Sequence, residues 1–387
     1  MKTNIDFNID SNYFFRLLIV LAAATLIEGC TQPSTSSTSS IVLESNSTNL
    51  PYKFGGIFQL SGPQTPYGTL AKNGMELAIE DINNAGGING RRVTGIYEDS
   101  GGDRAKAATA AQKLISIDGI DALFTITPGM AGVVSPIAEE NKIPYIYIGS
   151  VNVFALNKTY VFKDYPSPQD LCEILAKKAI SLGHTKIALI GPNDEVTQYC
   201  KEGAERISPL LSFETFLPGD VDIKTQLTKI QNSNPTALIL YALAGDCGNA
   251  LRQIKDLGLS VQLFLPVQSF ACGNQENSNA FADQMKTAFG SDIALDETST
   301  DPRLVSFMNR LEERGKVINL KGSALEYDIL MEMAHAYSGC SDRECVINNL
   351  HTLHVEGLTG NISYRDQIVV RDVMLTTYAE GKWVAQK

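Results

Sequence analysis

The residues best suited to nucleophilic, redox or metal chemistry in this 387-residue sequence are its 7 cysteines and 4 histidines. Cys30 follows an apolar leader, and the other six cysteines lie in the body of the chain. An even number of cysteines in an exported chain favours disulfides over free thiols. A metal site is the alternative, but no two of the six have the C-x₂-C spacing. We expect the pairs Cys340–Cys345, Cys247–Cys272 and Cys172–Cys200, the first of which would close a tight turn between two helices.

The histidines are not spaced for catalysis. His184 lies in an expected helix–strand turn and His335 on an expected helix, where packing or surface roles suffice. His351 and His354 have the i, i+3 spacing that could chelate a metal, but no third ligand is evident. The sequence also lacks a phosphate-binding loop, a G-x-G-x-x-G fingerprint, a G-x-S-x-G elbow and an H-E-x-x-H helix. We therefore predict a protein that is not an enzyme and has no cofactor and no bound metal.

Residues 1–29 are typical of a signal peptide. The apolar run Leu17–Ile27 has the length of a signal-peptide core and is too short to span a bilayer. A small residue directly before Cys30 resembles the lipobox of exported lipoproteins, although Glu28 departs from that pattern. We expect Cys30 to carry a lipid, with ordinary signal cleavage or an uncleaved anchor as the alternatives. The Ser- and Thr-rich residues 30–50 then form a flexible tether.

The composition favours a soluble globular protein and argues against nucleic-acid binding. The chain is 44% hydrophobic and 19% charged, with a net charge of −11. The hydrophobic fraction is ordinary for a soluble globular protein, and the length predicts two or three domains. Because nucleic-acid binding needs a basic surface, the acidic balance argues against a nucleic-acid partner.

Strands and helices are expected to alternate from Tyr52 onward. Continuous apolar runs such as 188–190 and 238–241 are typical of parallel strands that helices cover on both faces. The expected strands are 52–60, 92–98, 122–126, 145–148, 186–190, 213–217, 237–241 and 262–265, with short strands 362–364 and 373–378. The expected helices are 69–85, 103–117, 131–141, 167–182, 195–207, 223–232, 249–257, 302–314, 323–337 and 342–353. Two such βα blocks predict an α/β protein with two doubly wound lobes.

An ordered set of short motifs resembles one family. Phe58–Pro63 (FQLSGP), Gly74–Ala78 (GMELA), Gly86–Gly90 (GGING) and Glu356–Ile362 (EGLTGNI) look like segments of the type I periplasmic binding proteins, in the branch of the leucine/isoleucine/valine-binding proteins of ABC importers. The resemblance covers about residues 52–385.

The resemblance implies two Rossmann-like lobes, joined by three crossovers, that close over a ligand. The first lobe would comprise residues 52–165 and 290–357, and the second residues 166–289 and 358–387.

The ligand is expected at the carboxyl ends of the strands, where helix N-termini offer free N–H groups. In the family, the loop matching Thr127, Gly129 and Met130 binds the ligand carboxylate, and the segment matching Gly149 and Ser150 offers a carbonyl and a hydroxyl. The second lobe would add Ala244 and Gln268. Tyr67 and Tyr199 match aromatic residues that close over the ligand, and the alternative for both is an ordinary surface aromatic.

The departures from the family bear on the charge of the ligand. Pro128 and Val151 stand where amino-acid binders of this branch have hydroxyl side chains. Gln268 lies near the position of the acidic residue that pairs with the α-ammonium group, and a buried ammonium without a counter-charge is costly. Asp246 is the nearest acidic candidate, or it caps the next helix. A carboxylate or amide with a modest apolar body is therefore as plausible as an amino acid.

The most favoured function is that of an extracytoplasmic solute-binding lipoprotein of an ABC importer. Its partners would be a small-molecule ligand and the membrane subunits of the transporter, and a lipid anchor would be its one attachment to the membrane. A ligand sensor with the same fold and an enzyme with the same fold are the alternatives.

Overall fold

The computed structural model describes residues 50–62, 64–242, 244–266, 279–315, 320–379 and 382–386. The predicted signal peptide, Cys30 with nearly all of the predicted tether, Gln268 and Cys272 lie outside these ranges. Within them, no helix is both long enough and apolar enough to cross a bilayer.

Eight strands form the first sheet, in the order β11-β12-β13-β5-β4-β3-β1-β2. Neighbouring strands from β2 to β13 run parallel, and β12 and β11 extend the sheet antiparallel. The bounds are β1 (Tyr52–Phe58), β2 (Val93–Asp99), β3 (Ala122–Ile126), β4 (Tyr145–Ile148), β5 (Val161–Asp164), β11 (His354–Gly357), β12 (Gly360–Arg365) and β13 (Ile368–Arg371).

Seven strands form the second sheet, in the order β15-β14-β10-β9-β8-β6-β7. Its strands are parallel from β7 to β10, and β14 and β15 are antiparallel. The bounds are β6 (Ile187–Pro192), β7 (Ser212–Phe216), β8 (Ala237–Leu240), β9 (Gln262–Pro266), β10 (Phe289–Ile293), β14 (Val373–Ala379) and β15 (Lys382–Ala385).

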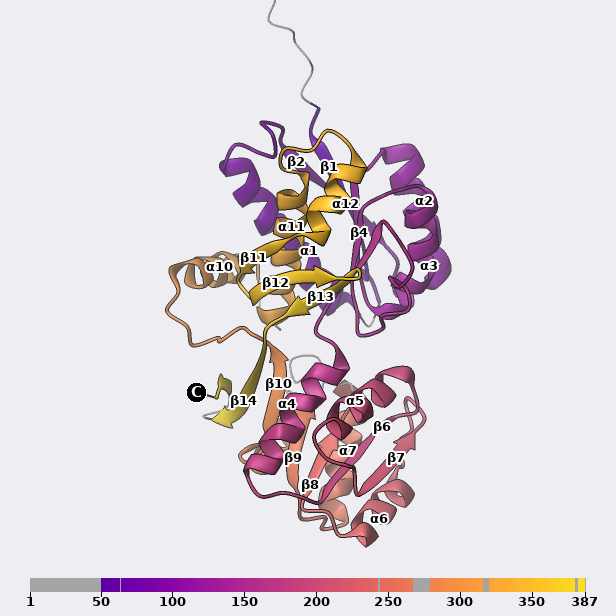
Figure 1. Ribbon diagram of the computed structural model, residues 1–387, viewed down its shortest axis with the longest axis vertical. Helices are drawn as coiled ribbons and strands as arrows, with labels where there is room; N and C mark the ends of the chain where they lie inside the picture. The colour runs from indigo at the N-terminus through magenta and orange to yellow at the C-terminus, as the bar shows by residue number, and fades with distance from the viewer. Residues whose placement is uncertain are drawn as a thin grey trace, which may run out of the picture. The chain divides into compact units, whose positions relative to one another are not determined.

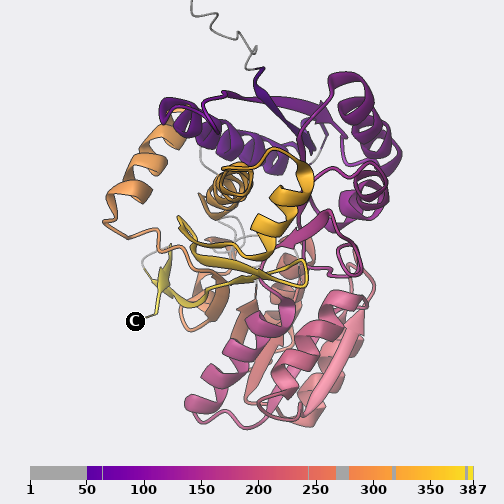
Figure 2. The same cartoon turned by 45° about the horizontal axis from the view of Figure 1, so that its top comes forward.

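Helices cover both faces of each sheet, as the apolar strands predict (Figure 1). On the first sheet, α2 (Arg104–Lys113) and α3 (Pro128–Glu140) pack on one face, while α1 (Thr65–Asn84), α11 (Leu320–Tyr337) and α12 (Arg343–His351) pack on the other. On the second sheet, α4 (Pro168–Ser181) and α5 (Glu195–Glu205) lie opposite α6 (Lys224–Ser233) and α7 (Ala244–Asp256). Figure 2 shows α1 and α11 running side by side. A π-helical turn (Leu114–Asp118), α9 (Ala282–Met285) and α10 (Pro302–Glu313) complete the set.

Several helices begin at an N-cap side chain that accepts a backbone N–H. Asp103 accepts from Lys106 N at 2.8 Å, which confirms the predicted N-cap of α2, and Ser167 caps α4 in the same way. Pro168 and Pro302 stand at the first turns of α4 and α10, where a missing N–H costs nothing. Polar caps and prolines therefore set these helix starts close to the predicted residues.

The chain passes between the sheets three times, after β5, after β10 and after β13. Two of these passages fall at different residues from those predicted. Strand β10 pairs with β9, so the chain reaches the first lobe after Ile293 and not at residue 290. Strands β12 and β13 belong to the first sheet, so the last passage follows Arg371 and not residue 357. The short linker of one residue, Asp372, joins the two sheets there.

Two of the predicted disulfides are present. Cys172–Cys200 joins α4 to α5, with the two Cα atoms 5.2 Å apart. Cys340–Cys345 closes the turn between α11 and α12, with a Cα separation of 5.5 Å. The third predicted pair is not tested, because Cys272 lies outside the described residues.

The two disulfides close chain segments of very different length, so their loss should differ in cost. Cys172 and Cys200 are 28 residues apart and Cys340 and Cys345 are 5 apart. We expect replacement of the first pair by serine to lower the free energy of unfolding by about 3–4 kcal/mol, and replacement of the second pair by about 2 kcal/mol. Urea denaturation of both double variants measures this, and an equal or smaller loss for the first pair would contradict the prediction.

Candidate ligand-binding site

The predicted site residues of the first lobe lie at one edge of its sheet, where the parallel strands end. Thr127 follows β3, Gly149 and Ser150 follow β4, and Tyr67 lies in the first turns of α1, after β1. The carboxyl ends of parallel strands meet at one edge of a sheet, where open α/β proteins bind ligands. The fold therefore brings these four residues to the carboxyl-end edge of the first sheet.

Thr127 adopts a backbone conformation that is rare for its type. Its φ is 75° and its ψ is 141°, and a positive φ is an outlier for a β-branched residue. The side-chain Nε2 of the buried Gln59 donates to Thr127 Oγ1 at 3.3 Å. The Oε1 atom of Gln59 is also buried and has no hydrogen-bond partner among the described residues. Polar groups and backbone strain thus gather at the start of α3.

The N-terminus of α3 offers donors for an anion. The first N–H groups of a helix have no acceptor within it, and Pro128 contributes none, so Gly129 and Met130 supply the donors here. A Cβ atom on Gly129 would lie 3.7 Å from Arg104 Nε, so this guanidinium lies beside the helix start. Arg104 is exposed and takes part in none of the ion pairs found among the described residues. The site therefore combines a helix dipole with an unpaired cation.

The position of Tyr67 depends on the glycine that follows it. A Cβ atom on Gly68 would lie 2.1 Å from the carbonyl oxygen of Gln59, so glycine lets α1 approach the end of β1 closely. Tyr67 is half-buried there, and burial raises the pKa of its hydroxyl. This close approach holds the tyrosine at the same edge as Gln59.

Two tyrosines of the second lobe lie near the predicted residues of the first. The Tyr199 hydroxyl donates to the Glu195 carboxylate within α5, which together with burial raises the pKa of Tyr199 to about 12. Burial raises the pKa of Tyr147 in β4, and the nearby Tyr145, Glu195 and Tyr199 raise it further. Tyr241, directly after β8, is buried, which raises its pKa, and the neighbouring Ser150 side chain opposes this rise. Ser150 of the first lobe and Tyr241 of the second therefore lie close to one another.

The remaining second-lobe candidates lie at the start of α7 or outside the described residues. Ala244 begins α7, which starts five residues earlier than predicted. Asp246 lies in the first turn of α7, and its carboxylate accepts a hydrogen bond from Gly219 N at 3.2 Å. Burial raises the pKa of Asp246. The carboxylate is therefore engaged with a neighbouring loop, and Gln268 lies outside the described residues.

Sequence reasoning missed three residues of this region. Gln59 is part of the quoted FQLSGP motif, but its buried amide becomes visible only in the fold. Tyr241 ends a strand-like apolar run, which could have marked it as a residue of the strand end. Arg104 carries no local signal, because α2 and α3 come together only in the folded chain.

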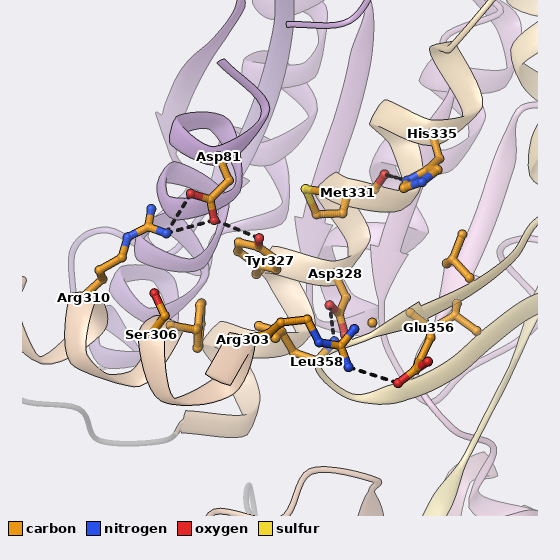
Figure 3. Close-up of a pocket in the computed structure, with 14 residues that line it drawn as sticks. Asp81, Arg303, Ser306, Arg310, Tyr327, Asp328, Met331, His335, Glu356 and Leu358 are labelled. Atoms are coloured by element: carbon orange, nitrogen blue, oxygen red, sulfur yellow. Dashed lines mark hydrogen bonds and ion pairs between the residues drawn. The ribbon is translucent and has the colours of Figure 1, made fainter. Parts of the chain in front are cut away.

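A separate cavity of about 370 Å³ lies between α10, α11 and the β11–β12 hairpin, and none of the predicted site residues lines it (Figure 3). Its charged groups bind one another. Arg310 donates to both oxygens of Asp81, and Arg303 to Glu356 at 3.0 Å. Within the ranges that the structure describes, no three His, Cys, Asp or Glu side chains gather in a way that could hold a metal. The cavity therefore does not change the location of the candidate site.

Residues 51–382 match the family described as periplasmic binding proteins. Curated relatives include Leu/Ile/Val-binding protein homolog 3 of Brucella melitensis, which is 25% identical over 217 residues, 53% of this chain and 58% of the relative. Leu/Ile/Val-binding protein homolog 8 of Brucella abortus is 31% identical over 124 residues, 31% of this chain and 30% of the relative. The matched part thus covers 58% of the first relative's length and 30% of the second's.

Solved structures share the fold. The branched-chain amino acid transporter substrate binding protein of Streptococcus pneumoniae, in complex with isoleucine, has a TM-score of 0.73 at 21% identity, and the match covers 87% of this chain and 100% of that one. An R. palustris solute binding protein in complex with 4-hydroxybenzoate has a TM-score of 0.74 at 17% identity, with 87% and 96% covered.

The fold and the strand-end site define a two-lobed binding protein of type I architecture. Because the family match covers most of the sequence, this chain belongs to the periplasmic binding protein family, whose members bind solutes and are not enzymes.

The strained backbone of Thr127 gives a direct test of the site geometry. Glycine normally destabilises a folded chain relative to alanine, but at a positive φ the order reverses. We expect Thr127→Gly to have a free energy of unfolding about 1 kcal/mol above that of Thr127→Ala, by urea denaturation. A Thr127→Ala variant that is the more stable of the two would show that the loop does not hold this conformation.

Proposed function

We propose that this chain is the solute-binding component of an ABC importer and that it takes up a small organic acid, amino acid or amide. The ligand binds between the strand ends of the two lobes, which close over it, and Tyr67 and Tyr199 cover it. The protein works outside the cytoplasm, held at the membrane by a lipid on Cys30, and delivers the ligand to the membrane subunits. The family match and the names of the relatives support this role.

The observation that carries the ligand class is the start of α3. Free N–H groups at Gly129 and Met130, the hydroxyl of Thr127 and the unpaired guanidinium of Arg104 together favour an anionic group. Gln59 adds a buried amide that can orient a polar ligand. A carboxylate is the group that these donors fit best.

The opposite end of the ligand is expected to be neutral. Gln268 replaces the acidic residue of branched-chain amino-acid binders, and the Asp246 carboxylate already accepts a hydrogen bond from Gly219. A solved structure of the same fold holds 4-hydroxybenzoate, an acid without an ammonium group. An acid with an uncharged body therefore suits this site better than a zwitterion.

A thermal-shift and calorimetry panel tests the proposed function. The panel contains benzoate, 4-hydroxybenzoate, short-chain acids, their amides, and leucine, isoleucine and valine. We expect at least one uncharged-tail acid or amide to bind more tightly than the three amino acids, and at 100 times its Kd to add about 2.7 kcal/mol of stability. Sub-micromolar binding of leucine would contradict the ligand class, and would mean that Asp246 supplies the missing charge.

Arg104 provides the second test, since its charge should act on acids and not on their amides. We expect Arg104→Met to weaken the binding of a carboxylate from the panel about fivefold, because an exposed ion pair contributes about 1 kcal/mol. The matched control is Arg252→Met, which removes an equally exposed arginine from α7. Equal affinity for the acid in the wild type and Arg104→Met would remove Arg104 from the site.

A further inference from the structure

Charged side chains are buried at each point where the chain passes between the sheets. Lys163 and Asp164 end β5, Asp292 lies near the end of β10, and Arg371 ends β13. Each of these residues is less than a tenth exposed. Charges are rarely buried unless they are paired. The partners of these residues therefore show which connecting segments are held together.

Arg371 joins the first and third connections. Its Nε and Nη2 atoms donate to the two oxygens of Asp164 at 2.6 and 2.9 Å, in the bidentate geometry of a strong pair. Nη2 also donates to Glu332 Oε1 of α11 at 2.6 Å. The side chains of all three residues are 0% exposed. The β5 and β13 ends are therefore held together by a fully buried ion cluster.

Tyr165 joins the first and second connections. Its hydroxyl donates to Asp292 Oδ1 at 3.1 Å, and Asp292 Oδ2 lies 3.9 Å from Lys321 Nζ at the start of α11. The ammonium of Lys163 donates to the carbonyl oxygen of Tyr165, whose φ of 150° is unusual for a side-chain-bearing residue. The three connections are thus linked through one set of side chains.

We propose that Arg371 and Tyr165 are positioning residues for ligand binding, which hold the three connections in the arrangement where Ser150 meets Tyr241. The inference rests on the proposed function, because it concerns how a ligand is captured between the lobes. A displacement of one connection relative to another would break charge-assisted hydrogen bonds between buried groups. The cluster therefore favours one arrangement of the lobes, and weakening it lowers the fraction of protein that is ready to bind.

The first test uses the ligand-free protein. Tyr165→Phe removes one hydrogen bond, and Arg371→Lys keeps the charge but loses the bidentate pair. The matched control is Arg310→Lys, which changes another Arg–Asp pair, in which Arg310 Nη1 donates to both oxygens of Asp81, between α10 and α1 of the first lobe. We expect small-angle scattering to give a larger radius of gyration for Tyr165→Phe and Arg371→Lys than for the wild type, and an unchanged one for Arg310→Lys.

The second test measures affinity, with 4-hydroxybenzoate and isoleucine as probes. We expect Kd for the probe that binds to rise about fivefold or more in Tyr165→Phe and Arg371→Lys, and to stay unchanged in Arg310→Lys. Identical scattering curves for all four proteins would overturn the proposal, whatever the affinities. If the wild type binds neither probe, the ligand of the proposed function is another member of the acid and amide panel, while the scattering comparison still decides the role of Arg371 and Tyr165.

Discussion

The guanidinium of Arg371, enclosed by Asp164 and Glu332, is the interaction that holds β13 beside β5 in the first sheet, at the strand ends where the chain leaves for the second. An unpaired charge at this depth would cost several kcal/mol, so β13 has to lie against β5 even though these strands share one paired position, Ile368 and Lys163. This constraint assigns β13 to the first sheet and leaves Asp372 as a one-residue link to β14 of the second.

The strand-end site follows from that arrangement and from the parallel order of each sheet. Parallel strands present all their carboxyl ends at one edge, and the three connections leave both lobes from this edge. The strained Thr127, the start of α3 and Arg104 then lie together at one corner of the first lobe. Tyr241 meets Ser150 from the second lobe. The buried charges at the three connections therefore also affect how the second lobe contributes to the strand-end site.

The sequence predicted the regular βα units well, because their apolar strands and polar caps are local signals. It missed five strands, β5, β10, β11, β13 and β15, and for β5, β10 and β13 the reason is physical. The segments Val161–Asp164, Phe289–Ile293 and Ile368–Arg371 each carry a buried charge, which interrupts the apolar pattern of a strand. The partner that permits the burial, such as Glu332 for Arg371, lies far away in sequence. The lobe boundaries were misplaced at the residues where these charged strands occur.

The residues of the candidate site likewise differ in whether the sequence predicts them. Thr127, Gly129, Gly149 and Ser150 could be predicted, since strand ends and helix starts are visible as breaks in the pattern. Arg104 could not, because its place beside Gly129 depends on how two helices pack.

The measurement that tests the location of the site most directly is an NMR titration of ¹⁵N-glycine-labelled protein with 4-hydroxybenzoate. Glycines report on both candidate places, with Gly129 and Gly149 at the strand ends and Gly357 in the wall of the cavity beside α10. We expect the amide signals of Gly129 and Gly149 to shift with saturation while that of Gly357 stays in place. A shift of Gly357 with unchanged Gly129 and Gly149 would contradict a ligand site at the carboxyl ends of the strands.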